Sequence, residues 1–275
     1  MAEKAAFLGL GTMGRPMAAH LARRGFALAV YTRTEEKARA FAAEFGCGAA
    51  ATPAEAADGA AFVASCVLDD AALLALTDGP QGAFATLAPG AVYVDHSTVL
   101  PETVRGLARA AVARGAAFLD APVAGAVEKA RTGELAAMVG GDAAALETAR
   151  PFLSAYASAI RHMGPVGHGQ LTKMLNQIYQ AILIEGLCEG LTFGHRAGLD
   201  PDRLIEGLSA GDGTSWWLET RGRAMFGNLE KGLHAKHGRQ GLLVKDLALC
   251  LSEARRLDIG LPAAALVGQF PGRGQ

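Results

Sequence analysis

This sequence is poor in disulfide-forming and metal-binding patterns. Only four of its 275 residues are cysteines, and no two of them form a Cys-x-x-Cys pair. Such scattered cysteines predict buried, reduced thiols rather than a disulfide framework or a zinc site. The seven histidines show no His-Glu-x-x-His or other metal-ligand spacing. We therefore expect no bound metal.

The sequence also has neither an excess of charge of one sign nor a long hydrophobic run. The 26 Lys and Arg residues nearly cancel the 27 Asp and Glu residues, which leaves a net charge of -1. This balance excludes a global basic field that would attract nucleic acid. The longest apolar runs, such as residues 60–68, fall far below the ~20 residues that cross a bilayer. The first residues, MAEK, carry no secretory leader pattern, so we expect a cytoplasmic protein with no membrane partner.

The residues that are present predict an α/β fold followed by a helical one. Hydrophobic residues make up 51% of the chain, enough for a sizeable core. Short apolar runs alternate with alanine-rich helical stretches up to about residue 163, which predicts right-handed crossovers and a mainly parallel sheet. Strands are expected at residues 6–9, 26–31, 61–64, 91–95 and 117–120. The fold class is thus an N-terminal Rossmann doubly wound sheet followed by an all-α domain.

The strand signals stop after residues 164–167. Helical spacing continues at residues 170–197, 201–210, 215–226 and 242–256. We therefore place one domain at residues 1–163 and a second, all-α domain at residues 164–275.

Residues 9–14 read GLGTMG, which has Gly-x-Gly-x-x-Gly spacing. The pattern alone is weak, and an ordinary strand-to-helix turn is the alternative. Here, however, it follows the first predicted strand and opens the first helix, which is the context that dinucleotide binding requires. The glycines allow a tight turn and let the backbone approach a pyrophosphate at the helix N-terminus. The predicted cofactor contacts in this loop are Gly9, Gly11, Thr12, Met13 and Gly14.

The second predicted strand ends without the acidic residue that NAD sites usually carry there. Tyr31 is followed by Thr32, Arg33 and Thr34. A guanidinium at this place can hold a 2′-phosphate with two hydrogen bonds. We therefore expect NADP(H) as the preferred cofactor, with NAD(H) as an alternative. A solvated arginine on a loop remains the other interpretation.

Lys173 and Asn176 lie three residues apart at the start of a predicted helix, and so project from one face. A lysine beside a bound cofactor can hand a proton to a developing alkoxide if partial burial lowers its pKa. An amide one turn further on can orient the same oxygen. Taken alone, this spacing is a very weak signal, and a solvated helix face is the better interpretation.

Five motifs in order resemble the β-hydroxyacid dehydrogenases, a family that includes 3-hydroxyisobutyrate dehydrogenase and semialdehyde reductases. They are GLGTMGRPM at 9–17, DHST at 95–98, DAPVAG at 120–125, GHGQLTKMLN at 167–176 and KDL at 245–247. The resemblance implies a homodimer or homotetramer and a small carboxylate substrate such as 3-hydroxyisobutyrate, succinic semialdehyde or glyoxylate.

The resemblance also implies a role for individual residues. Lys173 is similar to the family's acid/base and Asn176 to its substrate-orienting neighbour. The nicotinamide and substrate pocket is implied at Val67, Leu68, Ser97 and Thr98. The substrate loop corresponds to Ala124 and Gly125, whose backbone would hold the substrate carboxylate. Lys245 matches a residue that reaches the cofactor from the helical domain.

The loop departs from the family pattern at two positions. Ala124 stands where the family usually has serine, and Ala126 where it usually has glycine. A lost neutral hydrogen bond costs about 0.5–1.5 kcal/mol, which affects the choice of substrate more than the reaction. Two alternative functions remain, an imine reductase-like enzyme and an inactive NADP(H)-binding protein. Lys173 argues against the imine reductases, which commonly carry another residue there.

Overall fold

The computed structural model describes residues 3–230 and 240–269. The chain divides into two compact units, one ending at Lys173 and the other beginning at Met174. The helix that contains this division runs on without a break, so the division lies inside it. The boundary at residues 163–164 that the sequence suggests stays a prediction.

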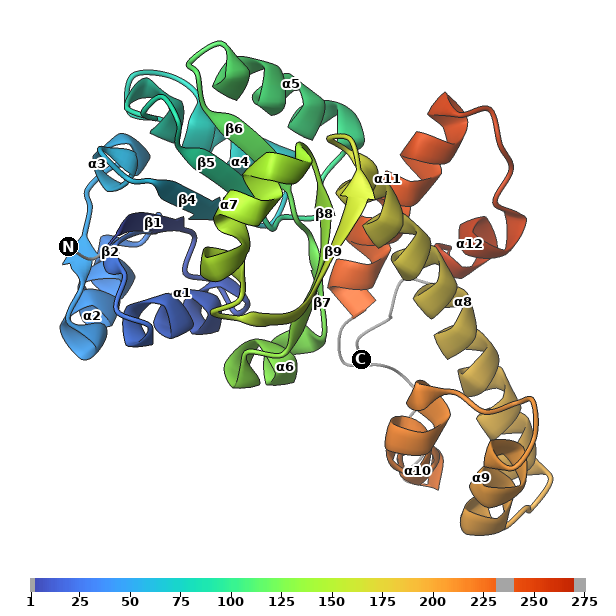
Figure 1. The fold of residues 1–275 in the computed structure, drawn as a ribbon. Coiled ribbons are helices and arrows are strands. Elements are labelled where there is room, and N and C mark those ends of the chain that lie inside the picture. The colour runs from blue at the N-terminus through green and yellow to red at the C-terminus, as the bar shows by residue number, and fades with distance from the viewer. Residues whose placement is uncertain (1–2, 231–239, 270–275) are drawn as a thin grey trace. The chain divides into compact units, whose positions relative to one another are not determined.

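The first unit is built on one sheet (Figure 1). Within the described residues its nine strands are β1 (Lys4–Leu8), β2 (Ala27–Tyr31), β3 (Gly48–Ala49), β4 (Phe62–Ser65), β5 (Val92–Asp95), β6 (Ala117–Asp120), β7 (Val123–Ala124), β8 (Leu135–Gly140) and β9 (Ala157–Gly164). The strand order is β3-β2-β1-β4-β5-β6-β8-β7, with β9 paired to β8. All neighbours from β3 to β6 are parallel, as the sequence predicts.

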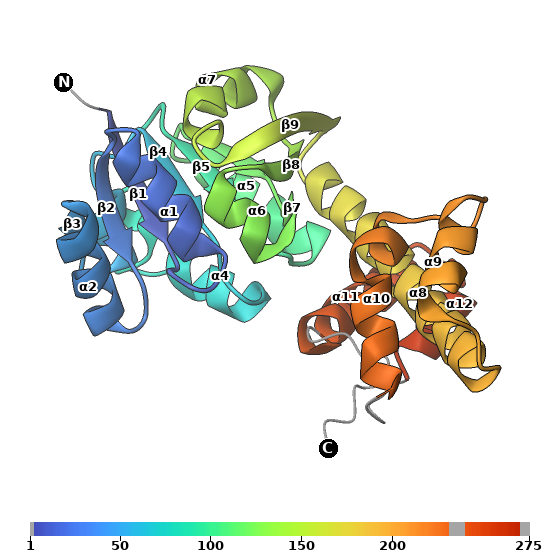
Figure 2. The same cartoon turned by 90° about the horizontal axis from the view of Figure 1, so that it is seen from below.

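Helices cover both faces of this sheet. One face packs against α1 (Gly14–Arg23), α2 (Glu35–Phe45) and α7 (Ala143–Leu153). The other packs against α3 (Pro53–Ala57), α4 (Asp70–Thr77) and α5 (Pro101–Val112). The short helix α6 (Ala126–Thr132) lies beside α1, and a 3₁₀ turn, η1, spans Ala83–Ala85. Figure 2 shows α1 and α2 side by side on the sheet. Because both faces are covered, the parallel strands are apolar throughout.

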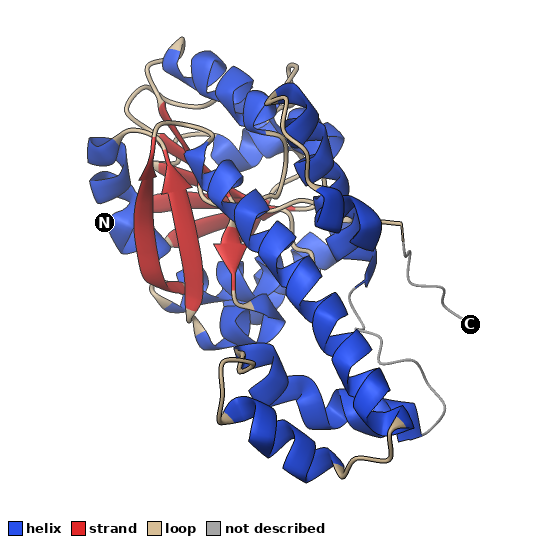
Figure 3. Cartoon of the chain, turned by 90° about the vertical axis from the view of Figure 1, so that its right-hand side faces the viewer, coloured by secondary structure: helices blue, strands red, loops and turns tan. Residues whose placement is uncertain are grey.

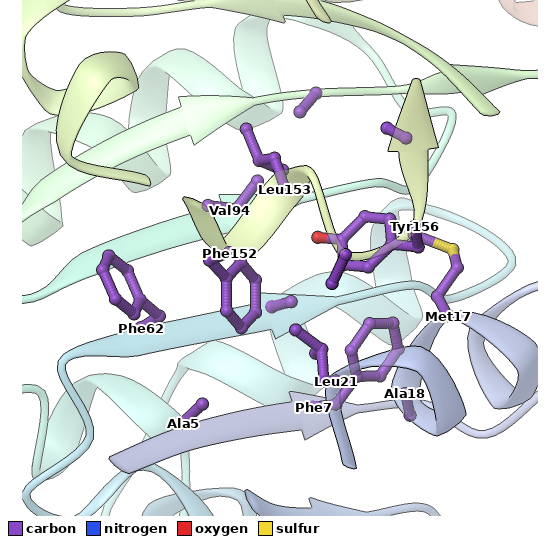
Figure 4. Packing of buried hydrophobic residues seen from close by; sticks show 14 of the residues in the cluster. Ala5, Phe7, Met17, Ala18, Leu21, Phe62, Val94, Phe152, Leu153 and Tyr156 are labelled. Atoms are coloured by element: carbon purple, nitrogen blue, oxygen red, sulfur yellow. The ribbon is translucent and has the colours of Figure 1, made fainter. Parts of the chain in front are cut away.

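Aromatic rings fill the core under α7. Phe152 stacks on Phe62 with ring centroids 5.3 Å apart and meets Phe26 edge-on at 5.6 Å. Tyr156 and Met17 are fully buried in the same cluster (Figure 4). The N-terminal unit thus has the close-packed interior that holds strand ends in fixed positions.

Three strands after β6 were not anticipated from the sequence. The segment of β8 reads LAAMVG and pairs with β6 and β7, and that of β9 reads ASAIRHMG and pairs with β8. In this part of the sheet the β6–β8 and β7–β8 pairs are antiparallel, whereas β8–β9 is parallel. Small residues such as alanine and glycine have weak strand preference, so pairing and burial decide these strands rather than local propensity.

The second unit is helical in its described part (Figure 3). It holds most of α8 (His168–Arg196), together with α9 (Pro201–Ser209), α10 (Trp216–Glu230), α11 (Gln240–Arg256) and α12 (Pro262–Val267). Two small apolar clusters hold them: one centres on Ala181, Leu247 and Ala264, and the other on Leu191 and Phe226. Among the described residues, no helix has the length and apolar character of a membrane span.

Candidate active site

The loop between β1 and α1 depends on its glycines. Gly9 has φ +102°, and a Cβ there would lie 2.4 Å from the Cys66 carbonyl oxygen. A Cβ on Gly14 would lie 2.0 Å from the Gly9 carbonyl oxygen. The backbone N–H of Gly9 also donates to the Tyr31 carbonyl oxygen at 2.7 Å. Two of the three glycines therefore hold the first strand, the loop and the first helix in close contact.

The middle glycine leaves open space instead. A Cβ on Gly11 would meet no atom within 4 Å. Helix α1 begins next to it with Met13 at the N-cap, no side-chain cap and no acidic residue in its first turn. The first N–H groups of this helix thus have no side-chain acceptor, and the helix dipole favours an anion there. These residues fit the pyrophosphate of a dinucleotide, which they would hold through backbone N–H groups.

A cavity of about 680 Å³ lies beside this loop, within the first unit. Gly11 and Thr12 line one part of it, and helices α1, α2 and α6 line the rest. Its charged residues are Arg15, Arg23, Lys37, Arg131 and Glu44. Four cations against one acid make this cavity favourable for phosphate groups.

The end of β2 also carries a cation. Thr32, Arg33 and Thr34 follow the strand directly, and Arg33 is exposed. The first acidic residue after them is Glu35, which pairs with Arg39 one turn further along α2. Arg33 therefore has the position from which a guanidinium can reach a group bound above β2.

Asp95, at the end of β5, joins the loops that follow β4 and β5. Its Oδ1 accepts hydrogen bonds from the hydroxyls of Ser65 and Ser97, each at 2.7 Å. The Ser97 hydroxyl oxygen in turn accepts from the N–H of Val67 at 3.0 Å. Burial raises the pKa of Asp95 to about 6, against the lowering effect of the two serine hydroxyls. The predicted pocket residues Val67 and Ser97 are thus directly bonded, and Leu68 and Thr98 follow them in the chain.

The predicted substrate loop begins with β7 and turns into α6. Ala124 ends the strand, Gly125 has φ +127° and Ala126 has φ +58°. A Cβ on Gly125 would lie 2.8 Å from the Cβ of Lys129. Gly125 and Ala126 thus form a tight turn, a setting in which successive backbone N–H groups can bind an anion.

Helix α8 starts against the ends of β5 and β6. Asp120 is the last residue of β6, and its carboxylate accepts from the N–H of Gly167 at 2.7 Å and of Gln170 at 2.9 Å. The Gln170 amide also bonds the segment after β5, donating to the Ser97 carbonyl oxygen at 2.8 Å. Lys173 lies one turn further on and is only 9% exposed. The structure thus places Lys173 in a buried part of α8, not on a solvated face.

Asn176 and Lys245 belong to the second unit, where a chain of contacts connects them. Asn176 donates from Nδ2 to Oε1 of Gln177 at 3.0 Å. Gln177 donates from Nε2 to Oδ2 of Asp246 at 2.6 Å. The Nζ of Lys245 lies 3.2 Å from Oδ1 of the same aspartate.

The structure brings most predicted residues to one edge of the sheet. The glycine loop, Arg33, Val67 and Ser97 all follow carboxyl ends of parallel strands, where α/β proteins bind their ligands. Three buried residues had no predicted role, namely Asp95, Asp120 and Gln170. Asp95 and Asp120 could have been found from the sequence, because each is an aspartate at the end of an apolar strand. No described group of three or more His, Cys, Asp or Glu side chains is placed to hold a metal.

Comparison with known proteins gives the family. A family model described as the NAD binding domain of 6-phosphogluconate dehydrogenase matches residues 4–164. A second, described as NAD-binding of NADP-dependent 3-hydroxyisobutyrate dehydrogenase, matches residues 167–272. The chain belongs to the β-hydroxyacid dehydrogenase family.

Individual β-hydroxyacid dehydrogenases and their relatives resemble nearly the whole chain. An uncharacterized oxidoreductase of Shewanella frigidimarina is 43% identical over 97% of this chain and 90% of its own length. The 3-hydroxyisobutyrate dehydrogenase of Pseudomonas aeruginosa is 36% identical over 95% of this chain and 88% of its own. The structure of Mycobacterium tuberculosis 3-hydroxyisobutyrate dehydrogenase with L-serine has 28% identity and a TM-score of 0.88, covering 99% of this chain and 94% of that one.

Membership in the β-hydroxyacid dehydrogenases confirms the fold class, a parallel-rich Rossmann sheet followed by helices. It also confirms the enzyme class, an NAD(P)-dependent hydroxyacid dehydrogenase. The roles of individual site residues stay predictions.

Proposed function

We propose that this enzyme is an NADP(H)-dependent oxidoreductase of small β-hydroxyacids or the corresponding semialdehydes, with Lys173 as acid/base. The observation that carries the proposal is the position of Lys173. It is buried on α8, one turn beyond Gln170, whose amide bonds the loop of Ser97 at the carboxyl edge of the sheet. This edge also carries the glycine loop that fits a pyrophosphate.

The chemistry divides between the cofactor and the chain. A bound nicotinamide would supply the acceptor for the hydride that leaves the hydroxyl-bearing carbon of the substrate. Lys173 Nζ takes the hydroxyl proton as that C–O bond becomes a carbonyl, and returns it to the oxygen in the reverse direction. Asn176 orients the same oxygen, and the backbone N–H groups at Ala124 and Gly125 hold the substrate carboxylate. Thr98 and Leu68 would line the nicotinamide side, and Lys245 would contact the cofactor.

The preference for NADP(H) rests on the charges beside β2. Arg33, with the hydroxyls of Thr32 and Thr34, would surround the 2′-phosphate, and no carboxylate stands at the strand end to repel it. Lys37, on the next turn, lines the same cavity as Gly11. We expect Arg33→Ala to raise KM for NADPH at least tenfold and to change KM for NADH little. Arg39→Ala, an exposed α2 arginine paired with Glu35, is the matched control. An unchanged ratio of the two KM values would contradict the preference.

The proposed substrate class follows from the family and from the loop at β7. Relatives named for 3-hydroxyisobutyrate and a neighbour solved with L-serine support a C3–C4 acid with a hydroxyl on the β carbon. A panel of 3-hydroxyisobutyrate, L-serine, succinic semialdehyde and glyoxylate, each assayed with NADPH and NADH, tests it. Ala124→Ser restores the family's usual hydroxyl, and the substrates whose KM falls in this variant are those that this hydroxyl contacts.

The role of Lys173 has a direct test. We expect Lys173→Ala to lower kcat by ~10²–10⁴-fold, because removing a general acid costs that much. The dissociation constant for NADPH, measured by nucleotide fluorescence, should change by less than about threefold. A variant that binds NADPH normally and retains full activity would overturn the mechanism.

We also propose that the chain forms a homo-oligomer, a dimer or a tetramer. On α8, the large apolar side chains of Leu175, Tyr179, Ile182 and Phe193 are exposed. Their spacing places them along one face of the helix, a pattern that suits burial against a second copy. Tyr179→Lys with Ile182→Glu should shift the mass measured by light scattering toward the monomer, whereas the surface variant Val112→Lys on α5 should not. A monomeric wild-type protein at micromolar concentration would contradict this proposal.

A further inference from the structure

The catalytic helix takes its N-terminal cap from a distant strand. Helix α8 follows Gly167, which has φ +93° and no side chain that could cap it. Asp120 supplies the cap instead, with Oδ1 on the N–H of Gly167 and Oδ2 on that of Gln170. A carboxylate bonded to two N–H groups at a helix start satisfies orphan donors and complements the helix dipole. The position of the first turn of α8 is therefore set by the end of β6.

Glycines make this contact tight. A Cβ on Gly140 would lie 2.4 Å from Oδ1 of Asp120. A Cβ on Gly169 would lie 2.8 Å from Oδ2 of Asp120 and 2.4 Å from the carbonyl oxygen of Met138. Because real side chains cannot approach so closely, the helix start has no room to shift toward the strands. Glycine at positions 140 and 169 thus has a physical cause in the carboxylate that the two residues contact.

A second clamp connects the same turn to the loop after β5. Gln170 is fully buried, its Nε2 donates to the Ser97 carbonyl oxygen at 2.8 Å, and its Oε1 accepts from the N–H of Val99 at 3.2 Å. Lys173 is three residues beyond Gln170, on the same side of the helix. The amide therefore fixes the separation between Lys173 and the segment that holds Ser97 and Thr98.

We propose that Asp120 is a positioning residue for the reaction, which together with Gln170 fixes Lys173 against the loop of Ser97 and Thr98. This inference rests on the proposed acid/base role of Lys173. Both oxygens of Asp120 are bonded to backbone N–H groups, so it acts through the helix and not by exchanging a proton with substrate. Burial raises the pKa of Asp120 to about 6, so the carboxylate is ionised and accepts both bonds at neutral pH.

A double-mutant cycle tests the proposal. Asp120→Asn keeps the side-chain shape but turns an amide N–H toward one of the two backbone donors. We expect kcat to fall about 10–100-fold, because misplacing a reacting group by about 1 Å has effects of this size. The dissociation constant for NADPH should stay within about twofold. In the Lys173→Ala background, the further loss of kcat from Asp120→Asn should nearly disappear, because the group that it positions is gone.

Two further variants keep the result interpretable. Asp142→Asn makes the same substitution at the cap of α7, where Asp142 accepts from the N–H of Ala145 at 2.9 Å, and should leave kcat within about twofold of wild type. If Asp120→Asn does not fold, Gln170→Met takes its place in the cycle, since it keeps most of the volume and loses both hydrogen bonds to residues 97–99.

Each outcome has a distinct meaning. An equal loss of kcat from Asp120→Asn with and without Lys173 would show a merely structural role and overturn the positioning proposal alone. An unchanged kcat in Asp120→Asn would do the same. If Lys173→Ala alone retains full activity, the acid/base role fails, and the positioning proposal is overturned with it.

Discussion

The side-chain amide of Gln177 donates to Oδ2 of Asp246 across 2.6 Å and so ties α8 to α11. This bond fixes which way the amide faces, because the carboxylate accepts only from the nitrogen. The oxygen of Gln177 is then left to accept from Asn176. A buried acid on α11 thereby sets the orientation of the residue that we expect to hold the substrate oxygen.

Asp246→Ala should weaken substrate binding more than turnover. Without the carboxylate, the Gln177 amide can rotate and Asn176 loses its fixed acceptor. We expect KM for the hydroxyacid to rise about tenfold with a smaller change in kcat, and stability to fall by about 1–3 kcal/mol, the cost of an unmade buried hydrogen bond. Asp202→Ala, which removes an exposed partner of Arg223 in the same unit, should change stability by less than about 1 kcal/mol. Steady-state kinetics measure KM and urea unfolding measures stability. An unaltered KM in Asp246→Ala would contradict the proposed effect of Asp246 on Asn176.

Two glycines of the loop at residues 9–14 should have different roles, one in cofactor binding and one in stability. Gly11→Ala places a methyl group in open space, so the midpoint of thermal unfolding should not change, while the dissociation constant for the dinucleotide should rise at least tenfold. Gly9→Ala combines positive φ with a Cβ only 2.4 Å from a carbonyl oxygen, and should destabilise the fold by more than about 2 kcal/mol. Calorimetry and nucleotide titration distinguish the two. Equal cofactor affinity in Gly11→Ala and wild type would contradict the assignment of this loop.

Asp95 should make stability depend on pH. Its pKa is about 6 in the folded protein and 3.8 without the fold, so the folded state binds a proton more tightly between these values. Its contribution is complete below about pH 4 and is lost as pH rises through 6. Relative to Asp95→Asn, the wild type should lose up to about 3 kcal/mol between pH 4 and pH 7.

The difference in stability between the wild type and Asp95→Asn separates the pH dependence due to Asp95 from that of the nearby titratable groups. Asp120, whose pKa is also raised, acts in the same direction as Asp95. Burial lowers the pKa of His96 to about 4, so its contribution increases with pH and opposes theirs. Both residues are present in each protein, so their contributions cancel in the difference except for the part of the Asp120 pKa shift that the charge of Asp95 causes, which is the smallest of its causes. Asp95→Asn also buries an amide group beside Ser65 and Ser97, which adds a constant offset, so the slope of the difference is the measured quantity. Parallel curves from urea unfolding at pH 4, 5, 6 and 7 would contradict the prediction.

Ala126 is a site of backbone strain. Its φ of +58° is a conformation that a side chain makes costly, by about 1–2 kcal/mol. Ala126→Gly removes this cost but gives the unfolded chain more freedom, so we expect a net gain of up to about 1 kcal/mol. Ala113→Gly, at a residue with φ −60° after α5, should instead destabilise by about 0.5–1 kcal/mol. Urea midpoints for the two variants decide the point, and a loss of stability in Ala126→Gly would be the opposite result.

Features encoded over short stretches of sequence were predictable. The loop at residues 9–14 lies between a strand and a helix because its glycines are needed within that one turn. The spacing of Lys173 and Asn176 likewise indicated a shared helix, and α8 contains both. In contrast, the strands β8 and β9 are rich in small residues and owe their existence to pairing, β8 with β6 and β9 with β8. Nothing in the residues around 135–164 carries that information.

The partners of the buried polar residues were not predictable for the same reason. Asp120 bonds an N–H group 47 positions later in the chain, and Gln177 bonds a carboxylate 69 positions later. Each side chain alone resembles any other polar residue at the end of an apolar stretch. A partner set by the topology of the sheet, or by the packing of two helices, leaves no local pattern to detect.

The capping of α8 by Asp120 also has a consequence for the order of folding. Since the acceptor at the start of α8 comes from a strand, a fragment beginning at this helix lacks it and frays at its first turn. In the proposed mechanism, Lys173 reaches its working position only after β6 has joined its neighbours, because the start of its helix is held by Asp120 at the end of that strand. We therefore expect competence for proton transfer to be acquired late in folding, once the sheet is complete.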